Sequence, residues 1–243
     1  MDYNDYQAGA SSEHFWFKAK RQLIFSLLNS VEHSSPTKSL SHNILNIGAG
    51  TGDDLEIIKN FGKIYAIDVN QKALDLIPSD LVFEKKLTDA CNLEYQDNFF
   101  DRIVAFDVLE HIENDQQAVH EILRTLKPGG FFIFTVPAFN FLYSEHDRRL
   151  EHYRRYNKPM IRKLFTDFKQ IRLGYWNFLL FPAAVLQRII NKNRKNKEVM
   201  TFNATSKVNT LFYNILNFET QLITYHVPFP YGLSLFGIYQ KPR

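Results

Sequence analysis

The strongest constraint on the fold is a glycine-rich turn between a short apolar segment and a helical pattern. The segment Ile44–Ile47 is mostly apolar, Gly48, Gly50 and Gly52 follow at alternate positions, and a helical pattern begins at Leu55. Glycine lets the backbone take unusual dihedral angles and lets a ligand approach with no Cβ in the way. The stretch therefore predicts a strand, a tight ligand-binding turn and a helix N-terminus.

The charges beside this turn indicate which kind of ligand it binds. Asp53 and Asp54 stand at the start of the predicted helix, where they would repel a pyrophosphate and attract an ammonium or a sulfonium group. S-adenosylmethionine carries both of these cations. Asp68 lies 20 positions after Gly48, at the end of the next predicted strand, where a carboxylate can accept hydrogen bonds from ribose hydroxyls. We therefore expect S-adenosylmethionine as the cofactor.

Composition limits the class of protein. The chain has 243 residues, is 45% hydrophobic and 15% aromatic, and carries a net charge of +3, which gives no uniform electrostatic argument for nucleic acid. Cys91 is the only cysteine and fits a reducing compartment. The polar segment Met1–Gln7 does not resemble a secretory signal, and no apolar run reaches the roughly 18 residues of a spanning helix. These features predict a cytoplasmic location.

Strand and helix patterns alternate after the glycine turn. Strands are predicted at Ile44–Gly48, Ile64–Asp68, Leu81–Glu84, Arg102–Phe106 and Phe131–Val136. A turn at Lys127–Gly130 is expected before the last of them. Repeated strand and helix units imply a parallel sheet covered by helices on both faces, with ligands at the carboxyl ends of the strands.

Five ordered motifs carry a resemblance to a known family. They are Ile44–Leu55, Asp68, Thr88–Ala90, Phe100–Ile112 and Leu126–Gly130. Together these motifs resemble the class I S-adenosylmethionine-dependent methyltransferases over roughly residues 44–137. The resemblance implies an α/β fold with a Rossmann-like, seven-stranded, mostly parallel sheet and helices on both faces. Gly232–Gln240 would supply the last, antiparallel strand.

The resemblance also implies a set of cofactor contacts on the glycine loop and at the strand ends. This set comprises Gly48, Gly50, Gly52, Asp53, Asp68, Val69, Asp89, Ala90, Phe106 and Asp107. The family usually has an acidic residue where Asn46 stands. Asparagine can accept a hydrogen bond but brings no charge, so either cofactor affinity is weaker or Asp53 compensates.

Three histidines are candidate catalytic bases. Methyl transfer from a sulfonium is an in-line displacement, and a base is needed only if the acceptor must lose a proton. His111 follows the fourth predicted strand and is the first candidate, although the imidazole can instead brace the loop; His146 and His152 come second. Asp107, Glu110 and His111 also resemble the metal-binding set of ubiquinone-pathway O-methyltransferases. Because adjacent helical positions point apart, we expect no metal.

An arginine-rich segment follows the fifth predicted strand and would lie over the active-site edge. Guanidinium groups bind oxyanions bidentately, and the interleaved tyrosines suit a substrate with an anionic part. The predicted substrate contacts are Arg148, Arg149, Tyr153, Arg154, Arg155 and Tyr156. The alternative is a solvated helix with arginine to glutamate pairs, each of which would stabilise little.

Helical segments flank the predicted core. Glu13–Leu28 predicts an amphipathic helix that either packs on the sheet or covers the cofactor. A helix at Pro159–Phe168 and a sixth strand at Gln170–Tyr175 precede an apolar segment at Trp176–Ile190. The basic run Asn191–Lys197 and a second helical pattern at Val208–Tyr225 complete an insertion.

The insertion is interpreted as a helical hairpin with several uses. An apolar helix followed by a basic run is typical of contact with an anionic membrane, which predicts peripheral contact through 177–197. Packing of the hairpin on itself and on the sheet is nevertheless the interpretation that we favour for its apolar faces, and a homodimer interface is a further alternative. We expect a single methyltransferase domain, divided into an N-terminal helix and linker (1–42), a Rossmann-like core (43–176), the insertion (177–231) and the last strand (232–243).

The functional expectation is methyl transfer from S-adenosylmethionine to a small or lipid-linked, anionic acceptor. The arginine-rich segment would meet the anionic part of the acceptor and the hairpin its apolar part. A non-catalytic cofactor-binding or membrane-associated scaffold is the alternative from a different class. A nucleic-acid methyltransferase is a third hypothesis, and the moderate net charge argues against it.

Overall fold

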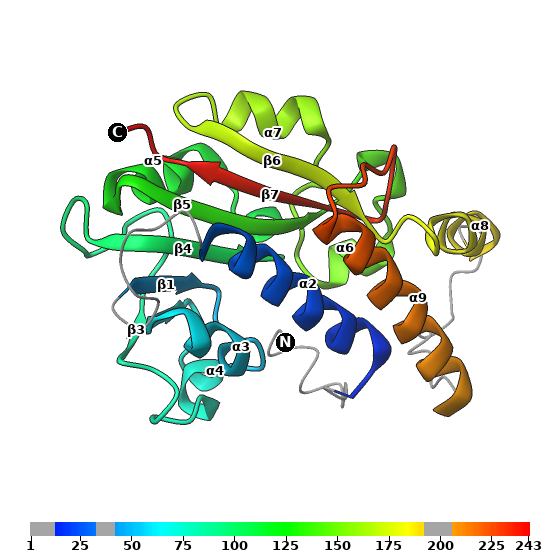
Figure 1. Cartoon of the computed structure of the whole chain (residues 1–243), viewed down its shortest axis with the longest axis horizontal. Coiled ribbons are helices and arrows are strands. Elements are labelled where there is room, and N and C mark those ends of the chain that lie inside the picture. Colours follow the sequence, from blue (N-terminus) through cyan, green and yellow to red (C-terminus); the bar gives the residue numbers. More distant parts are fainter. Residues whose placement is uncertain (1–12, 33–41, 192–205) are drawn as a thin grey trace.

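The computed structural model describes residues 13–32, 42–191 and 206–243, and these build one seven-stranded sheet (Figure 1). The strand order is β3-β2-β1-β4-β5-β7-β6, and only β7 runs antiparallel to its neighbours. The strands are β1 (Asn43–Ile47), β2 (Lys63–Asp68), β3 (Glu84–Leu87), β4 (Phe100–Phe106), β5 (Leu126–Pro137), β6 (Lys169–Trp176) and β7 (Ser234–Gln240). The predicted Rossmann-like sheet with an antiparallel last strand is confirmed.

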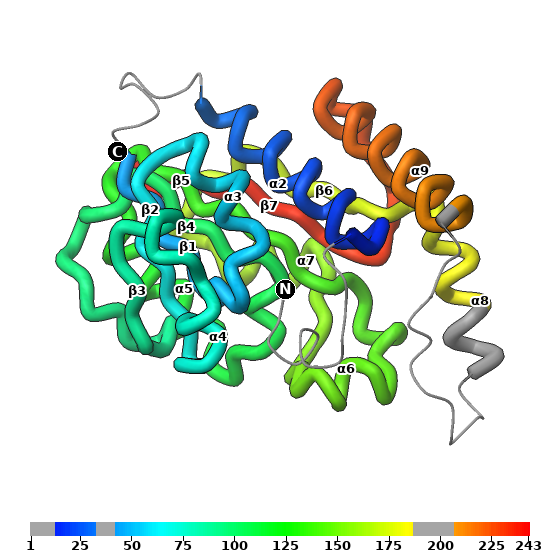
Figure 2. The backbone as a smooth tube through the Cα atoms, turned by 90° about the horizontal axis from the view of Figure 1, so that it is seen from below, coloured from blue at the N-terminus to red at the C-terminus, as the bar shows by residue number. Residues whose placement is uncertain are grey.

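Helices cover both faces of the sheet. The helices of the described chain are α2 (Phe15–Glu32), α3 (Leu55–Ile58), α4 (Gln71–Leu76), α5 (Asp115–Thr125), α6 (Glu145–Arg149), α7 (Lys158–Leu164), α8 (Phe181–Asn191) and α9 (Ser206–Thr224). Short 3-10 turns are η2 (Lys59–Phe61), η3 (Leu109–His111) and η4 (Asn140–Leu142). One apolar core joins the sheet to α2, α3 and α9, and a second joins it to α5 and α7 (Figure 2).

The third strand lies later in the sequence than predicted. Leu81–Glu84 was chosen for its apolar residues, but β3 is Glu84–Leu87 and pairs with β2. Leu81 is buried before the strand begins, and the amide of Phe83 donates to the carbonyl of Ile64. β3 is an edge strand, and edge strands commonly carry charged residues such as lysine, so the apolar run was a misleading signal.

The expected turn at Lys127–Gly130 is part of β5. Pairing of β4 with β5 begins at Leu126 opposite Phe100, and the register shifts before Arg102. Gly129 has φ of +79°, and its amide donates to the carbonyl of Lys241. Glycine therefore permits an irregularity inside β5, and this segment is not a separate turn that precedes the strand.

The insertion is helical as predicted, but α9 packs against α2. The amide of Phe15 donates to Oδ1 of Asn209 at 2.8 Å, and the hydroxyls of Ser26 and Thr224 lie 2.6 Å apart, so the two helices run parallel. Figures 1 and 2 show α9 beside α2 and α8 leading away from both. The apolar face of α9 therefore completes the core next to the N-terminal helix.

A buried carboxylate joins the two helices of the insertion. Glu219 on α9 is fully buried and accepts hydrogen bonds from the amides of Phe178 and Leu179, just before α8, at 2.9 to 3.1 Å. Burial raises the pKa of Glu219, although these amide hydrogen bonds oppose the shift. Among the described helices, none has the length and apolar composition needed to cross a membrane. The linker at 33–41 and the basic run from Lys192 to Lys197 lie outside the described residues.

Candidate active site

The glycine loop after β1 has the backbone that its sequence predicts. Gly48, Gly50 and Gly52 have φ of +66°, +52° and +87°, which is the left-handed region that favours glycine. A Cβ at Gly48 would lie 2.5 Å from Cγ2 of Val108, which follows β4. The segment after β4 therefore lies directly against the loop, and this close approach requires glycine.

Asp68 at the end of β2 holds this loop through both carboxylate oxygens. The amide of Gly50 donates to Oδ2 at 2.8 Å, and the amide of Asn70 donates to Oδ1 at the same distance. Thr51 donates its hydroxyl to Oδ2 of Asp53 at 2.7 Å, which orients the carboxylate at the start of α3. The loop, Asp53 and Asp68 thus lie together at the carboxyl edge of the sheet, as the sequence predicts.

The other predicted cofactor positions beside this edge differ in burial and in their hydrogen bonds. Val69 is exposed directly after Asp68. Asp89 accepts a hydrogen bond from the amide of Cys91 at 2.7 Å, and Ala90 between them is buried. Asn46, where the related family usually carries an acid, is buried within β1.

A lysine from α2 reaches this edge of the sheet. Nζ of Lys20 lies 2.8 Å from Oδ2 of Asp107 and donates to the carbonyl of Phe106 at 3.2 Å. Burial disfavours the charge on Lys20, but Asp107 and Asp54 outweigh this cost and raise its pKa. Burial likewise opposes ionisation of Asp107, but Lys20 and a hydrogen bond from Thr135 lower the pKa of that carboxyl.

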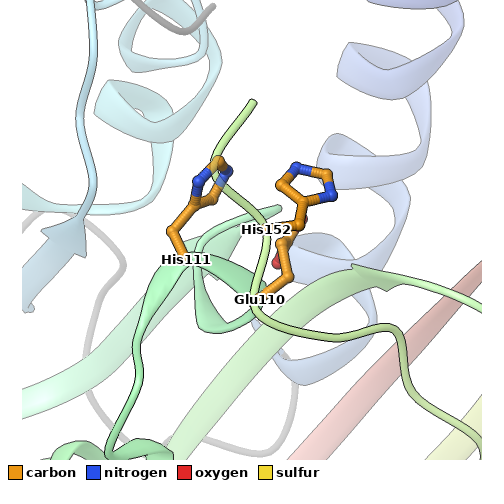
Figure 3. Close-up of side chains that lie close together, drawn as sticks. All are labelled: Glu110, His111 and His152. Carbon is orange, nitrogen blue, oxygen red and sulfur yellow. The ribbon is translucent and has the colours of Figure 1, made fainter. Parts of the chain in front are cut away.

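Three side chains gather beyond Asp107 (Figure 3). Glu110 and His111 lie in η3, and His152 comes from the segment after α6. One ligand-type atom from each side chain lies within 4.8 Å of the other two, and the two imidazole rings meet edge to face with centroids 4.5 Å apart. The structure therefore brings together two of the three predicted histidines, while His146 lies on α6 and outside this cluster.

Glu110 is unusual because its carboxylate is buried without a hydrogen bond among the described residues. The residue is 0% exposed, and neither carboxylate oxygen has a hydrogen-bond partner within the described part of the chain. Burial, together with the nearby charge of Asp107, raises the pKa of Glu110 well above its ordinary value. A buried charge without a partner is costly, so this carboxylate needs either a proton or a cation.

His152 is oriented by a buried carboxylate. Nδ1 of His152 lies 3.0 Å from Oδ1 of Asp147, which also accepts from Nε of Arg155 at 2.7 Å. The amide and the hydroxyl of Ser144 donate to Oδ2 of the same carboxylate. Burial opposes the charge of Asp147, but the hydrogen bonds from His152 and Arg155 hold its pKa well below the usual range. The pairing with Asp147 therefore fixes the orientation of the His152 ring and leaves Nε2 as the other ring nitrogen.

The arginine-rich segment is more internal than predicted. Arg155 is buried on Asp147, and Arg154 pairs with Asp115 at 2.7 Å. Tyr156 is buried and donates to Oδ2 of Asp115 at 2.8 Å. We therefore do not retain these three residues as substrate contacts, because their polar groups already brace the fold.

The remaining three predicted substrate contacts lie at the surface. Arg148 is exposed and pairs with Glu145 at 2.9 Å. Arg149 and Tyr153 are also exposed. Substrate contact by these three residues stays a prediction.

An aromatic cluster occupies the carboxyl ends of β5 and β6. Phe139 stacks on Tyr175 with centroids 5.2 Å apart and contacts Phe141 and Phe181 at 5.4 and 5.9 Å. Tyr231 contacts Phe181 at 4.9 Å. Phe141 is 71% exposed, so the cluster presents an apolar surface on the same edge as the glycine loop.

Sequence reasoning missed two groups at this site, Lys20 and Asp147. Lys20 could have been found because it lies on the same helical face as Trp16, Leu23 and Leu27, where a lone lysine among apolar residues is costly unless it is paired. No comparable pattern marks Asp147, because its partners His152 and Arg155 follow in an irregular segment.

Comparisons with known proteins agree with this geometry. Residues 45–134 match the family model described as a methyltransferase domain. Residues 45–134, which carry the glycine loop and the central strands, are therefore similar to a methyltransferase domain. This similarity supports S-adenosylmethionine as the cofactor.

Individual relatives are distant. An uncharacterized protein of Methanocaldococcus jannaschii is 29% identical over 60% of this chain and 66% of its own length. The ubiquinone/menaquinone biosynthesis C-methyltransferase of Cupriavidus taiwanensis is 30% identical over 37% of this chain and 40% of its own length. The chain thus spans less than two thirds of either relative.

A solved structure shares the fold. Phosphoethanolamine N-methyltransferase 2 of Haemonchus contortus, in complex with S-adenosyl-L-methionine, superposes with a TM-score of 0.57 at 18% identity. The superposition covers 89% of this chain and 52% of that one. At this identity the likeness concerns the fold alone.

Proposed function

We propose that this protein transfers the methyl group of S-adenosylmethionine to a small or lipid-linked acceptor whose reacting atom carries a proton. The observation that carries this proposal is the contact between the glycine loop after β1 and the segment after β4. Val108 lies against Gly48, and the cluster of Glu110, His111 and His152 begins two residues after Val108. A cofactor on the glycine loop would therefore face titratable side chains.

The reaction needs orientation more than covalent participation. A lone pair on the acceptor attacks the methyl carbon, the carbon–sulfur bond breaks, and its electron pair returns to sulfur to give S-adenosylhomocysteine. The acceptor proton ends on water. Holding the two reacting atoms in line supplies most of the acceleration, and assistance with the proton contributes typically about 10²–10⁴-fold.

Support for an apolar part of the acceptor comes from the aromatic cluster. Phe141 and Tyr231 expose ring surface at the edge where the acceptor must enter, and aromatic rings bind planar or apolar groups well. The relative from Cupriavidus taiwanensis is named for ubiquinone and menaquinone biosynthesis. We propose an acceptor with an aromatic or prenyl-like part, and an anionic part would have Arg148 and Arg149 as its available contacts.

An activity measurement tests this proposal. Purified protein is incubated with methyl-labelled S-adenosylmethionine and a cell extract split into lipid and water-soluble fractions. We expect label in one fraction, and loss of that label in a Gly48→Ala variant. Cofactor binding without transfer to either fraction would instead support the non-catalytic scaffold. Label that appears only in nucleic acid would support a nucleic-acid methyltransferase.

Membrane contact through 177–197 is retained as part of this proposal. Leu179 is exposed before α8, and Leu186 is exposed within it, which leaves apolar side chains at the surface of the insertion. Neutralising Lys192, Arg194, Lys195 and Lys197 should reduce cosedimentation with anionic liposomes. A wild-type protein that never cosediments with them would end the membrane proposal while leaving the methyltransferase activity untouched.

A further inference from the structure

We propose that Glu110, His111 and His152 bind a divalent transition-metal cation of the zinc type. One carboxylate oxygen and two imidazole nitrogens form a donor set that such cations prefer, and three protein ligands leave a position open for another molecule. Glu110 and His111 are adjacent in η3 and supply only two of the three ligands. The third ligand comes from a segment more than 40 positions later in the chain, which is why the sequence predicted no metal.

The distances are compatible with coordination after a small movement. The three ligand atoms lie within 4.8 Å of one another, so a cation placed between them would be at most about 2.8 Å from each atom. Metal bonds to oxygen and nitrogen are shorter, at about 2.0–2.2 Å. Each side chain would therefore move inward by roughly 0.7 Å, which rotation of the side chains provides. Figure 3 shows the two rings side by side, with Glu110 next to them.

The charges around the cluster favour a cation. Lys20 is neutralised by Asp107, and Arg155 is neutralised by Asp147. Glu110 remains as a buried carboxylate with no hydrogen bond to either oxygen within the described residues. A cation between Glu110 and the histidines would supply the missing partner for this carboxylate.

His152 has the support that metal-binding histidines usually have. Its Nδ1 is paired with Oδ1 of Asp147, which fixes the orientation of the ring and leaves Nε2 as the other ring nitrogen. Arg155 and Ser144 in turn hold Asp147. A histidine that only braces a loop has no need of a carboxylate fixed by three further groups.

This inference rests on the proposed function and specifies how the acceptor would be activated. A cation held here would supply Lewis acidity, which lowers the pKa of a hydroxyl close to it. The chemistry therefore favours an oxygen acceptor, such as a phenol or catechol, over an amine. The two histidines would then act as ligands, and the acceptor proton would leave to water.

Direct cation binding tests the proposal without relying on activity. Chelator-treated protein is titrated with zinc or cobalt(II), and uptake is followed by calorimetry and by the visible absorption of bound cobalt. We expect one equivalent to bind. Affinity should fall at least tenfold in His152→Ala and in Glu110→Gln, and the second variant preserves the volume of the buried side chain.

His120→Ala provides the matched control, because His120 is an exposed histidine on α5. Its affinity for the cation should equal that of the wild type. No stoichiometric uptake by the wild type, or equal losses in His120→Ala and His152→Ala, would overturn the proposal. S-adenosylmethionine binding is measured on the same samples, so failure of the proposed function would appear separately, as absent cofactor binding.

Discussion

Nζ of Lys20 lies 2.8 Å from Oδ2 of Asp107, so the N-terminal helix places a charge at the edge of the sheet that carries the glycine loop. Both side chains are largely shielded, at 11% and 28% exposure. Lys20→Met leaves Asp107 without its cation and should lower the free energy of unfolding by about 2–4 kcal/mol. Urea denaturation measures this difference. Lys18→Met on the same helix removes an exposed pair with Glu13 and should change stability by less than about 1 kcal/mol; equal effects would refute the argument.

Asp68 should control cofactor affinity. Asp68→Ala removes the acceptor for the amides of Gly50 and Asn70, and removes the carboxylate proposed for the ribose hydroxyls. We expect the free energy of S-adenosylmethionine binding to weaken by about 1–3 kcal/mol, because hydrogen bonds to a charged group are lost. Calorimetry measures the affinity. Asp75→Ala, at an exposed position on α4, is the control and should bind like the wild type.

Gly48 should be intolerant of any side chain for two separable reasons. Gly48→Ala introduces a Cβ 2.5 Å from Val108 and places alanine at φ of +66°. The left-handed conformation alone costs an alanine about 1–2 kcal/mol in the free energy of unfolding. Adding Val108→Ala should recover only the steric part of the loss, as measured by denaturant unfolding. If the losses in unfolding free energy from Gly48→Ala and Val108→Ala simply add in the double variant, the contact between these two residues is contradicted.

The buried carboxylate of Glu219 should make stability depend on pH. Burial raises its pKa in the folded state, so its contribution to stability is complete below the unfolded pKa of about 4.3 and declines as pH rises through the folded pKa. The stability of the wild type relative to Glu219→Gln should therefore fall over the pH range from about 4 up to the folded pKa. Urea midpoints across this range test the sign. Glu56→Gln, at an exposed position, should show no comparable trend.

Much of the central sheet was predictable because its signals are local. The apolar run of β1, the glycine turn and Asp68 follow one another closely, and the structure confirms this order. The third strand was misplaced because an edge strand need not be apolar, so the apolar residues favoured Leu81–Glu84 over the charged β3. Gly129 indicated a turn, although its positive φ is accommodated within β5.

The proposed acceptor side of the site depends on contacts between distant segments. Glu110 and His111 share η3, whereas His152 reaches them only because Asp147 and Arg155 fold the arginine-rich segment inward. Counting arginines could not reveal which of them are buried on carboxylates. The partner of Lys20 was equally hidden, because Asp107 is 87 positions away.

The pairing of α2 with α9 also determines when this protein can finish folding. Phe15 and Asn209 are 194 positions apart, so at 5–20 residues per second α2 waits about 10–40 s on the ribosome before its partner helix is made. Asp107 emerges much earlier and can capture Lys20 as soon as β4 joins the sheet. The N-terminal helix would thus dock first through one ion pair, and the surface that it shares with α9 would stay uncovered until α9 is made.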